Sequence, residues 1–415
     1  MVADTVTGPL TGRSILIGVT GGIAAYKAAD LVGCLVQHGT PVDVAMTPAA
    51  TSFVTVATFA AFTQRRVHDD VRERWSPGST GHISLARRAE VYVPATATAS
   101  ASASADGIAK LAAGMADDVV GAAALSSTWP LPIAPPMEHH MWRHPATIAN
   151  VQTLRDRGAT FVAPDSGHLA SGAVGDGRLA SRDVLVGAIR VALGRNGPLA
   201  RQRVLASAGG TGEPLDPVHF LGNGSSGRLG RALAEAAIDL GARVDLVSTV
   251  ASHVDLSSAD VTPVDTADEM ADEMADAIRS RIVGLSAPIM CAAVADHRPA
   301  RPSEPELKRA ESSAAFDLAV VENQDILKSV ASAGAPRVGF AAETDDLIVN
   351  VRTKLLAKRL DVVVVNEARA TIASCDVRQT LLFADGTTET LPRLAREAGA
   401  AVLCGRILEL LAGRR

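Results

Sequence analysis

The sequence predicts two α/β domains in succession, each built on a mainly parallel β-sheet covered by helices. Short, continuous aliphatic runs recur along the chain, and parallel strands that are buried on both faces have this composition. Stretches with apolar residues at helical spacing separate these runs, so strands and helices alternate. The alternation restarts after a basic segment that contains Asn196-Gly197-Pro198, which is a turn and linker signal. We therefore place the domains at residues 1–195 and 196–415.

In the first domain, the run Ser14–Val19 is the expected first strand, and Ile23–Gln37 is the helix that follows it. This helix has apolar residues at helical spacing and a stop signal at Gly39. The further expected strands are Pro41–Met46, Glu90–Val93 and Thr160–Val162. Parallel strands joined by helices require right-handed crossovers, which produce a doubly wound sheet.

The second domain repeats this organisation. A helix is expected over Gly227–Leu240, and the repeat at Asp268–Asp276 (DEMADEMAD) predicts another helix. Met270 and Met274 lie four residues apart in this repeat, which favours a buried methionine stripe with an acidic outer face. The expected strands are Val204–Ser207, Val244–Ser248, Pro288–Cys291, Arg337–Phe340 and Asp361–Val365.

Composition excludes several classes of protein. Hydrophobic residues make up 47% of the 415 residues and charged residues 20%, so the chain can bury a substantial core and is not of a disordered type. A net charge of −5 and 3% aromatic residues argue against nucleic acid and acidic lipid as partners. No apolar run reaches the roughly 20 residues of a membrane span, and the first residues lack a signal-peptide layout. The four cysteines are scattered and form no zinc or disulfide pattern. We expect a soluble cytoplasmic protein.

The first strand leads into the segment Gly18–Lys27 (GVTGGIAAYK), a small-residue turn followed by the start of a helix. Such a turn presents free backbone N–H groups and the positive end of a helix dipole, which together suit a phosphate or nucleotide. The GxGxxG pattern is absent, so tight packing between strand and helix is the alternative interpretation.

Two further segments of this domain carry histidines. His82 lies in GHISLA, just before an expected helix, where a histidine acts as a general base or ligand contact, or is simply a surface residue. The segment Ile133–Trp142 (IAPPMEHHMW) combines an apolar wall with polar side chains. The spacing of His139, His140 and His144 fits no standard zinc site, so no metal is assigned.

The motifs of the first half, in order, are TGGIAAYK, GHISLA, PAT, GIAKLAAGMADD, PPMEHHMW, HPAT and the stretch Gly167–Leu179. Together they resemble the flavin-dependent cysteine decarboxylases of the phosphopantothenoylcysteine decarboxylase type. The resemblance implies a flavodoxin-like fold, bound FMN and a trimer with flavin at the subunit interface. In that chemistry the thiol side is oxidised, carbon dioxide leaves, and the resulting enethiolate is protonated and reduced. The flavin-binding residues that it implies are Gly21, Gly22, Ile23, Thr47, Pro94, Ala95 and Thr96.

The same resemblance places His82 at the family's active-site histidine. Glu138 stands where the family has an asparagine whose amide helps to hold the substrate carboxylate. An ionised glutamate repels a carboxylate and cannot donate a hydrogen bond. Ser171 stands at the cysteine of the substrate flap and is a far poorer acid. Both replacements act against standard decarboxylation.

In the second half, Ser207–Gly230 holds two glycine clusters on either side of an acidic, proline-punctuated loop. Backbone N–H groups of the two clusters are suited to cradle phosphates, although an ordinary glycine-rich loop is the alternative. Lys354 and Lys358 are four residues apart and so share a helix face, which suits either a polyphosphate or solvent.

With MCAAVADHRP, NQDIL and VGFAAET, these segments resemble phosphopantothenate–cysteine ligases across nearly the entire second half. A decarboxylase-like half followed by this half resembles the bifunctional bacterial enzymes of coenzyme A biosynthesis. The resemblance implies a Rossmann-like domain that uses CTP and Mg²⁺. The phosphopantothenate carboxylate attacks the α-phosphate, pyrophosphate leaves, and cysteine displaces CMP, with cations and amides stabilising the developing charge.

This resemblance assigns Asn223 to the carbonyl region of the acyl-cytidylate. Glu306 stands at the first lysine of the family's KIKK segment, with Lys308 close by as a remaining cation. Gly212 and His219 stand at two further basic positions, so weaker phosphate binding is the expected direction. The nucleotide-contacting residues that it implies are Gly209, Gly210, Thr211, Ser225, Ser226, Ala292, Asp296, Gln324, Asp325, Ile326, Leu327, Phe340, Lys354 and Lys358.

The expected function is therefore CTP-dependent ligation of cysteine to 4′-phosphopantothenate, joined to FMN-dependent decarboxylation of the product. The expected partners are small molecules and further copies of the chain, with trimers of the first half and dimers of the second. Two alternatives remain open. One is a paralogue that activates a different carboxylate with CTP, and the other is a flavin- or nucleotide-binding protein without turnover.

Overall fold

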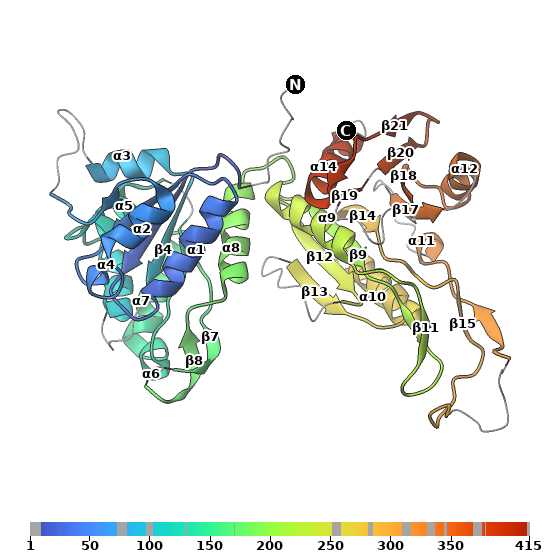
Figure 1. Ribbon diagram of the computed structural model, residues 1–415, viewed down its shortest axis with the longest axis horizontal. Coiled ribbons are helices and arrows are strands. Elements are labelled where there is room, and N and C mark those ends of the chain that lie inside the picture. The colour runs from blue at the N-terminus through green and yellow to red at the C-terminus, as the bar shows by residue number, and fades with distance from the viewer. Residues whose placement is uncertain are drawn as a thin grey trace. The chain divides into compact units, whose positions relative to one another are not determined.

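The computed structural model describes residues 10–72, 81–96, 103–128, 131–169, 171–250, 259–280, 285–308, 317–329, 337–343, 347–367, 376–377 and 379–412. The chain divides into two compact units between Leu193 and Gly194. Each unit has its own sheet (Figure 1). Each also has its own hydrophobic core. Every strand expected from an aliphatic run is present, with ends shifted by a few residues.

The sheet of the N-terminal unit has the strand order β3-β2-β1-β4, with parallel pairing throughout. Its strands are β1 (Ile15–Thr20), β2 (Val42–Met46), β3 (Val67–His68) and β4 (Val91–Thr96). Because β2 and β4 lie on opposite sides of β1, the strand order reverses between β1 and β4. Ligands of open α/β sheets bind at this reversal, beyond the carboxyl ends of the strands.

Helices cover both faces of this sheet. One core contains α1 (Ala25–Gln37), α2 (Val56–Thr63) and α8 (Arg182–Gly194). The other contains α3 (Gly81–Arg88) and α5 (Val119–Ser126). Successive side chains of a strand point to opposite faces, so Ile15 and Ile17 enter the first core and Leu16 the second. Helix α1 ends where Gly39 adopts a φ of +73°, at the predicted stop.

A third cluster, beside the main sheet, completes the N-terminal unit. It contains α4 (Ala103–Ala113), α7 (Pro145–Asp156) and the short strands β5 (Pro132–Ile133) and β6 (Thr160–Phe161). The short helix α6 (His139–Trp142) precedes α7. An antiparallel hairpin of β7 (Asp165–His168) and β8 (Val174–Arg178) follows and leads to α8.

The C-terminal unit contains, within the described residues, an eight-stranded sheet of order β13-β12-β9-β14-β17-β18-β20-β21. Strands β13 to β18 of this order pair in parallel, and β20 and β21 complete the edge in antiparallel pairing. The strand order reverses between β9 and β14. The strands are β9 (Arg203–Ala208), β12 (Arg243–Ser248), β13 (Ala259–Pro263), β14 (Leu285–Met290), β17 (Val338–Glu343), β18 (Val362–Glu367), β20 (Gln379–Phe383) and β21 (Thr388–Thr390).

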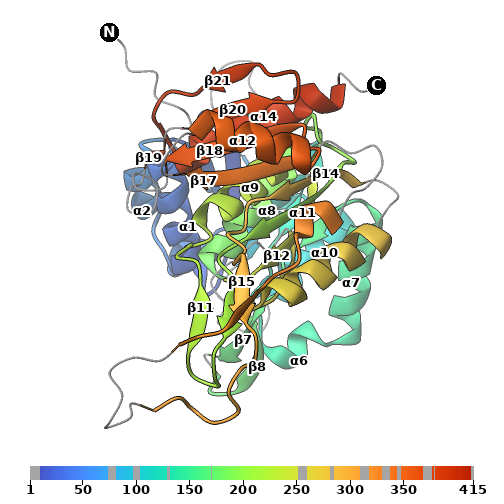
Figure 2. The same ribbon diagram turned by 90° about the vertical axis from the view of Figure 1, so that its right-hand side faces the viewer.

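Helices α9 (Arg228–Asp239) and α14 (Arg396–Ala412) pack on one face of this sheet. Helices α10 (Ala267–Ser280), α11 (Ile326–Ser329) and α12 (Leu347–Ala357) belong to the cores on the other face (Figure 2). Met270 and Met274 are fully buried on α10, as the repeat predicts.

Two antiparallel ribbons project from the eight-stranded sheet (Figures 1 and 2). The first ribbon consists of β10 (Gly212–Pro214) and β11 (Phe220–Gly222), and the second of β15 (His297–Pro299) and β16 (Val320–Glu322). Strands β10 and β15 lie against each other, so the ribbons form one arm. A small pair of β19 (Asp376–Val377) and β22 (Leu394–Ala395) lies before α14.

Candidate functional site

The turn after β1 meets the loop after β2 at the strand reversal of the N-terminal unit. Gly21 and Gly22 form this turn, and a Cβ atom on Gly21 would overlap Ala49, so the two segments touch. The backbone N–H of Thr47 donates to the Val19 carbonyl over 2.9 Å. The predicted residues Pro94, Ala95 and Thr96 pair in register with Gly18, Val19 and Thr20 at the same edge. The structure therefore brings the expected flavin-contacting segments together.

Two observations at this edge test whether the residues fit a flavin phosphate. Helix α1 begins after Ala24 without a side-chain cap, and the N–H groups of Ala25 and Lys27 donate to the carbonyls of Gly22 and Ala24, so no side chain neutralises the positive end of the helix dipole. The Thr20 side chain is only 6% exposed, and its hydroxyl has no hydrogen-bond partner in the described chain. A buried hydroxyl without a partner is unfavourable unless a ligand supplies one. The residues present fit a polar, anionic group such as FMN, and Ile23 is half exposed beside them.

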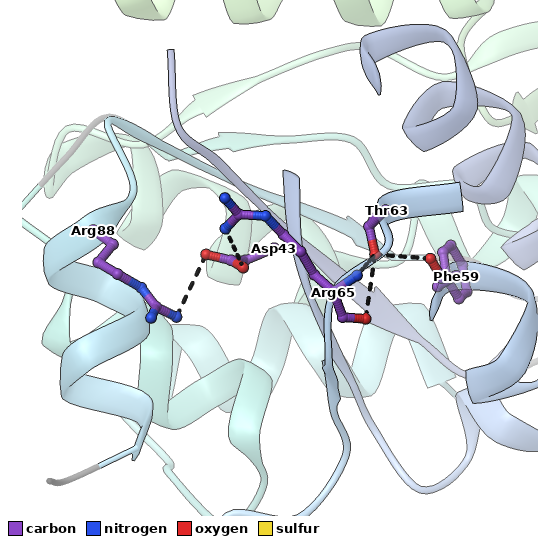
Figure 3. A network of polar contacts seen from close by, with 5 residues as sticks. All are labelled: Asp43, Phe59, Thr63, Arg65 and Arg88. Carbon is purple, nitrogen blue, oxygen red and sulfur yellow. Dashed lines mark hydrogen bonds and ion pairs between the residues drawn. The ribbon is translucent and has the colours of Figure 1, made fainter. Parts of the chain in front are cut away.

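His82 is the second residue of α3 and is partly buried, whereas the sequence had placed it in a loop before that helix. The far end of α3 is tied to the sheet by charge (Figure 3). Asp43 on β2 contacts Arg88 of α3 over 3.5 Å and Arg65 over 3.1 Å. Its side chain is 11% exposed, so a nearly buried carboxylate is shared by two guanidinium groups. This network anchors the helix that carries His82.

The substitution Asp43→Asn is expected to destabilise the N-terminal unit by about 1 kcal/mol, because two charge-assisted contacts are lost. The effect stays modest since Arg65 and Arg88 are about half exposed and regain water. Urea unfolding of the full chain measures it. Asp69→Asn, at an exposed carboxylate, is the matched control. Equal midpoints for the two variants would contradict this role of Asp43.

The hairpin of β7 and β8 is docked on the segment 137–143. The N–H of Met137 donates to the Gly177 carbonyl over 2.9 Å, and a Cβ atom on Gly177 would overlap the Met137 oxygen. Arg143 forms an ion pair with Asp176 over 3.0 Å, and Ser166 donates to the same carboxylate. A glycine at position 177 is therefore what allows the hairpin to approach so closely.

Glu138 lies on the segment 137–143, and Ser171 lies on the β7–β8 hairpin that contacts this segment. Glu138 caps α6 by accepting from the N–H of His140 over 2.8 Å. Ser171 lies in the exposed tip of the hairpin, which the N–H of Leu169 closes by donating to Ala173 over 2.8 Å. His144 is used as a cap too, because its Nδ1 accepts from Ala146. The described residues contain no cluster of three His, Cys, Asp or Glu side chains that could hold a metal ion.

At the strand reversal of the C-terminal unit, the loops after β9 and β14 are joined by hydrogen bonds. The N–H of Ala293 donates to the Gly209 carbonyl over 2.8 Å, and the N–H of Thr211 donates back to Ala293 over 3.2 Å. The buried Thr211 hydroxyl accepts from the N–H of Ala295 over 2.9 Å. Ala292 is fixed by donating its N–H to Ser207 Oγ over 3.1 Å. The first glycine cluster and the segment Ala292–Asp296 are thus held side by side at the carboxyl ends of β9 and β14.

The second glycine cluster lies against the first. A Cβ atom on Gly210 would overlap the carbonyl oxygen of Asn223, and Gly227 begins α9 with a φ of +68° and no side-chain cap. The amide nitrogen of Asn223 donates to the carbonyls of Ala293 and Val294 over 3.3 and 3.0 Å. Both of its N–H groups are therefore committed, and its oxygen remains to accept. Ser225 and Ser226 lie between Asn223 and the N-terminus of α9.

The predicted cations and the segment 324–327 lie on neighbouring elements of the same unit. Lys358 forms an ion pair with Asp325 over 3.2 Å, and Lys328 lies 3.7 Å from the same carboxylate. Lys354 is exposed on α12, and Lys358 lies just beyond its end, where its N–H still donates to the Lys354 carbonyl over 3.0 Å. Ile326 is buried against α10, Gln324 is exposed, and Leu327 and Phe340 are partly buried.

The arm carries the remaining candidates. His219 lies in the loop between β10 and β11, and Glu306 and Lys308 are exposed on the segment after β15. Sequence reasoning missed Asp216, whose buried carboxylate connects these two parts. Its only signal in the sequence was its place in an acidic, proline-punctuated loop.

Comparison with known proteins adds to this geometry. Residues 4–194 match the Flavoprotein family model, and residues 199–411 match the model described as DNA/pantothenate metabolism flavoprotein C-terminal domain. The Coenzyme A biosynthesis bifunctional protein CoaBC of Vibrio vulnificus (strain YJ016) is 40% identical over 361 residues, which are 86% of this chain and 87% of that protein. The protein of the same name from Bacillus subtilis (strain 168) is 37% identical over 395 residues, 93% and 94% of the two chains. The chain belongs to the CoaBC family.

Two solved structures are also similar. The C-terminal domain of Coenzyme A biosynthesis bifunctional protein CoaBC is 29% identical and covers 51% of this chain and 96% of its own, with a TM-score of 0.42. A PPC decarboxylase mutant complexed with pantothenoylaminoethenethiol is 25% identical. It covers 43% of this chain and 97% of its own, with a TM-score of 0.37.

Membership of the CoaBC family confirms the predicted family, the order of a flavoprotein half and a ligase-type half, and the class of bifunctional enzyme in coenzyme A biosynthesis. It also confirms a flavoprotein domain in the first half. None of the described helices is both long and apolar enough to cross a membrane.

Proposed function

We propose that residues 196–415 ligate cysteine to 4′-phosphopantothenate with CTP through an acyl-cytidylate, and that residues 1–195 decarboxylate the product with FMN. The observation that supports the ligase most directly is the convergence at the β9–β14 reversal. Two glycine clusters in contact, an uncapped helix N-terminus and Asn223 lie there together. Parallel α/β sheets bind their ligands at this position.

The ligase residues are suited to stabilise the negative charge of the nucleotide phosphates during the reaction. Amides of Gly209, Gly210 and the start of α9 are suited to stabilise the phosphate that the substrate carboxylate attacks. Lys354 and Lys358 are suited to neutralise the departing pyrophosphate, with Asp325 fixing Lys358. We assign Mg²⁺ to the nucleotide phosphates, where this ion usually binds.

In the decarboxylase half, FMN supplies a two-electron acceptor when bound. The Thr20 hydroxyl and the positive end of the α1 dipole are suited to hold its polar groups. We assign His82 to proton transfer near the substrate thiol and place Glu138 and Ser171 on the substrate side. Ser171 protonates an enethiolate poorly because its hydroxyl is a weak acid, so we expect a slow decarboxylase beside an active ligase.

The same proposal includes the assembly of the protein, with trimers formed by the first half and dimers formed by the second. We place the assembled enzyme in the cytoplasm. The arm exposes several large apolar side chains, which monomers seldom leave uncovered in a group. Phe220 is 69% exposed and Val218 62%. Val320 and Val321 on the second ribbon are exposed as well. A second copy of the arm would cover them.

Mass spectrometry of the protein incubated with CTP, Mg²⁺ and 4′-phosphopantothenate tests the ligase. An acyl-cytidylate mass that added cysteine converts to phosphopantothenoylcysteine is the expected result. Intact CTP and no new mass would overturn the assignment.

A second candidate, activation of a different carboxylate, is favoured by the exposed Glu306 and by His219 and Gly212 at positions where the family resemblance implies basic residues. In that case CTP is consumed with another acid and not with 4′-phosphopantothenate. A yellow protein that releases no pyrophosphate with any acid would instead favour binding without turnover.

A further inference from the structure

Asp216 is a buried carboxylate that joins two segments distant in the sequence. Its side chain is fully buried. Oδ1 accepts from the backbone N–H groups of Val218 and His219, both over 2.7 Å. Oδ2 accepts from the N–H of Leu307 over 2.8 Å, 91 residues away, and from Nδ1 of His219 over 2.9 Å. One oxygen therefore shapes a local turn, while the other makes the long-range connection.

A backbone contact supports the same connection. The N–H of Ser303 donates to the Leu215 carbonyl over 2.8 Å, so residues 303–308 are held at two points on the loop between β10 and β11. Glu306 and Lys308 are exposed on either side of Leu307. Fixing the Leu307 amide thus fixes the backbone from which both charged side chains extend.

The hydrogen bonds to both oxygens of Asp216 favour an ionised carboxylate, which accepts at each of them. Burial alone would raise the pKa of Asp216, but the hydrogen bonds from Leu307, His219 and Val218 outweigh burial and hold this pKa well below its usual range. Charge-assisted hydrogen bonds of this kind are roughly twice as strong as neutral ones. The His219 ring, by contrast, is more than half exposed and is available to a ligand.

We propose that Asp216 is a positioning residue of the ligase half, holding His219 and the segment 303–308 in the arrangement that binds the acid substrate. This inference rests on the proposed ligase function. Asp216 itself touches no substrate, because its side chain has no exposed surface. Its loss should therefore change binding of the acid and leave binding of CTP at the β9–β14 reversal unaltered.

The variant Asp216→Asn distinguishes the roles of the two carboxylate oxygens. Asparagine keeps Oδ1, which accepts from Val218 and His219, and replaces Oδ2 with an NH₂ group that cannot accept from Leu307. We expect hydrogen exchange of the amides in 303–308 to accelerate about tenfold or more, and kcat/KM for 4′-phosphopantothenate to fall about 10- to 100-fold. The KM for CTP should stay within about twofold, as for unaltered binding. Asp272→Asn, at an exposed carboxylate of α10, controls for lost charge.

Each result decides the inference. Unchanged exchange of 303–308 in Asp216→Asn overturns it, whatever the turnover. Faster exchange with an unaltered kcat/KM for the acid shows a purely structural contact and overturns it as well. If the wild-type protein shows no turnover, the proposed function fails separately. The inference then depends on protection of 303–308 by 4′-phosphopantothenate alone. Protection in the wild type that the variant loses supports it, and absence of protection in the wild type overturns it.

Discussion

Gly210→Ala is expected to lower the free energy of unfolding of the C-terminal unit by about 3 kcal/mol, the upper range for inserting an atom into a packed site. The added Cβ atom would overlap the carbonyl oxygen of Asn223, which is a backbone atom and cannot rotate away. Relief of the overlap requires the two glycine clusters to separate. We therefore also expect a loss of CTP-dependent acyl-cytidylate formation of at least about tenfold, since misplacement of a site by 1 Å has effects of this order or larger.

Urea unfolding followed by circular dichroism measures the stability change in the full chain. Gly224→Ala is the matched control from the same glycine-rich segment, because a Cβ atom there has no neighbour within 4 Å. Its stability should remain within about 0.5 kcal/mol of the wild type. If both variants lose stability equally, the contact between the clusters is not the cause.

The N-terminal unit is expected to lose up to about 3 kcal/mol of stability as the pH falls from 6.5 to 4, through one buried histidine. His68 on β3 is 4% exposed. Burial is the main cause that lowers the pKa of His68 from 6.5 to about 4. The nearby charge of Asp43 raises this pKa, and the charges of Arg66 and Arg88 lower it. In this window the unfolded chain takes up a proton at His68 and the folded chain does not. The unfolded state therefore binds more protons, and stability rises with pH.

Unfolding of wild type and His68→Gln at pH 4.5 and 7 isolates this contribution from the carboxylates that titrate in the same range. The variant should lose less stability than the wild type on acidification. His140→Gln, at an exposed histidine, should behave like the wild type. Identical pH dependence of wild type and His68→Gln would show that His68 is not the source.

Periodicity in the sequence predicted the central strands of both sheets and part of the cores, but not the strands β3, β13, β20 and β21 toward the sheet edges. The DEMADEMAD repeat predicted a buried methionine stripe, and both methionines are fully buried. Helix ends are set by weaker local signals, so His82 was expected outside the helix in which it lies. Asp43 interrupts an aliphatic strand, and no local pattern indicates that Arg65 and Arg88 neutralise it.

The candidate site was predictable where it follows from topology. Loops after neighbouring parallel strands meet at the strand reversal, so Gly209, Gly210 and Ala292 had to be close once the fold was right. The connection between Asp216 and Leu307 has no such origin. It depends on two hydrogen bonds, Leu307 to Asp216 and Ser303 to Leu215, between segments about 90 residues apart, and neither segment has a periodicity that encodes the other.

The two ribbons have a consequence for how this enzyme family can change. None of the described residues of the two ribbons belongs to a hydrophobic core of the C-terminal unit, so the arm adds little apolar burial to the sheet from which it projects. If the arm binds the acid as proposed, substitutions there change substrate recognition at little expense to the core. A lineage could then acquire a new acid substrate through the arm while the proposed nucleotide site at the β9–β14 reversal stays unchanged. The arm can therefore vary in sequence independently of the loops at the β9–β14 reversal.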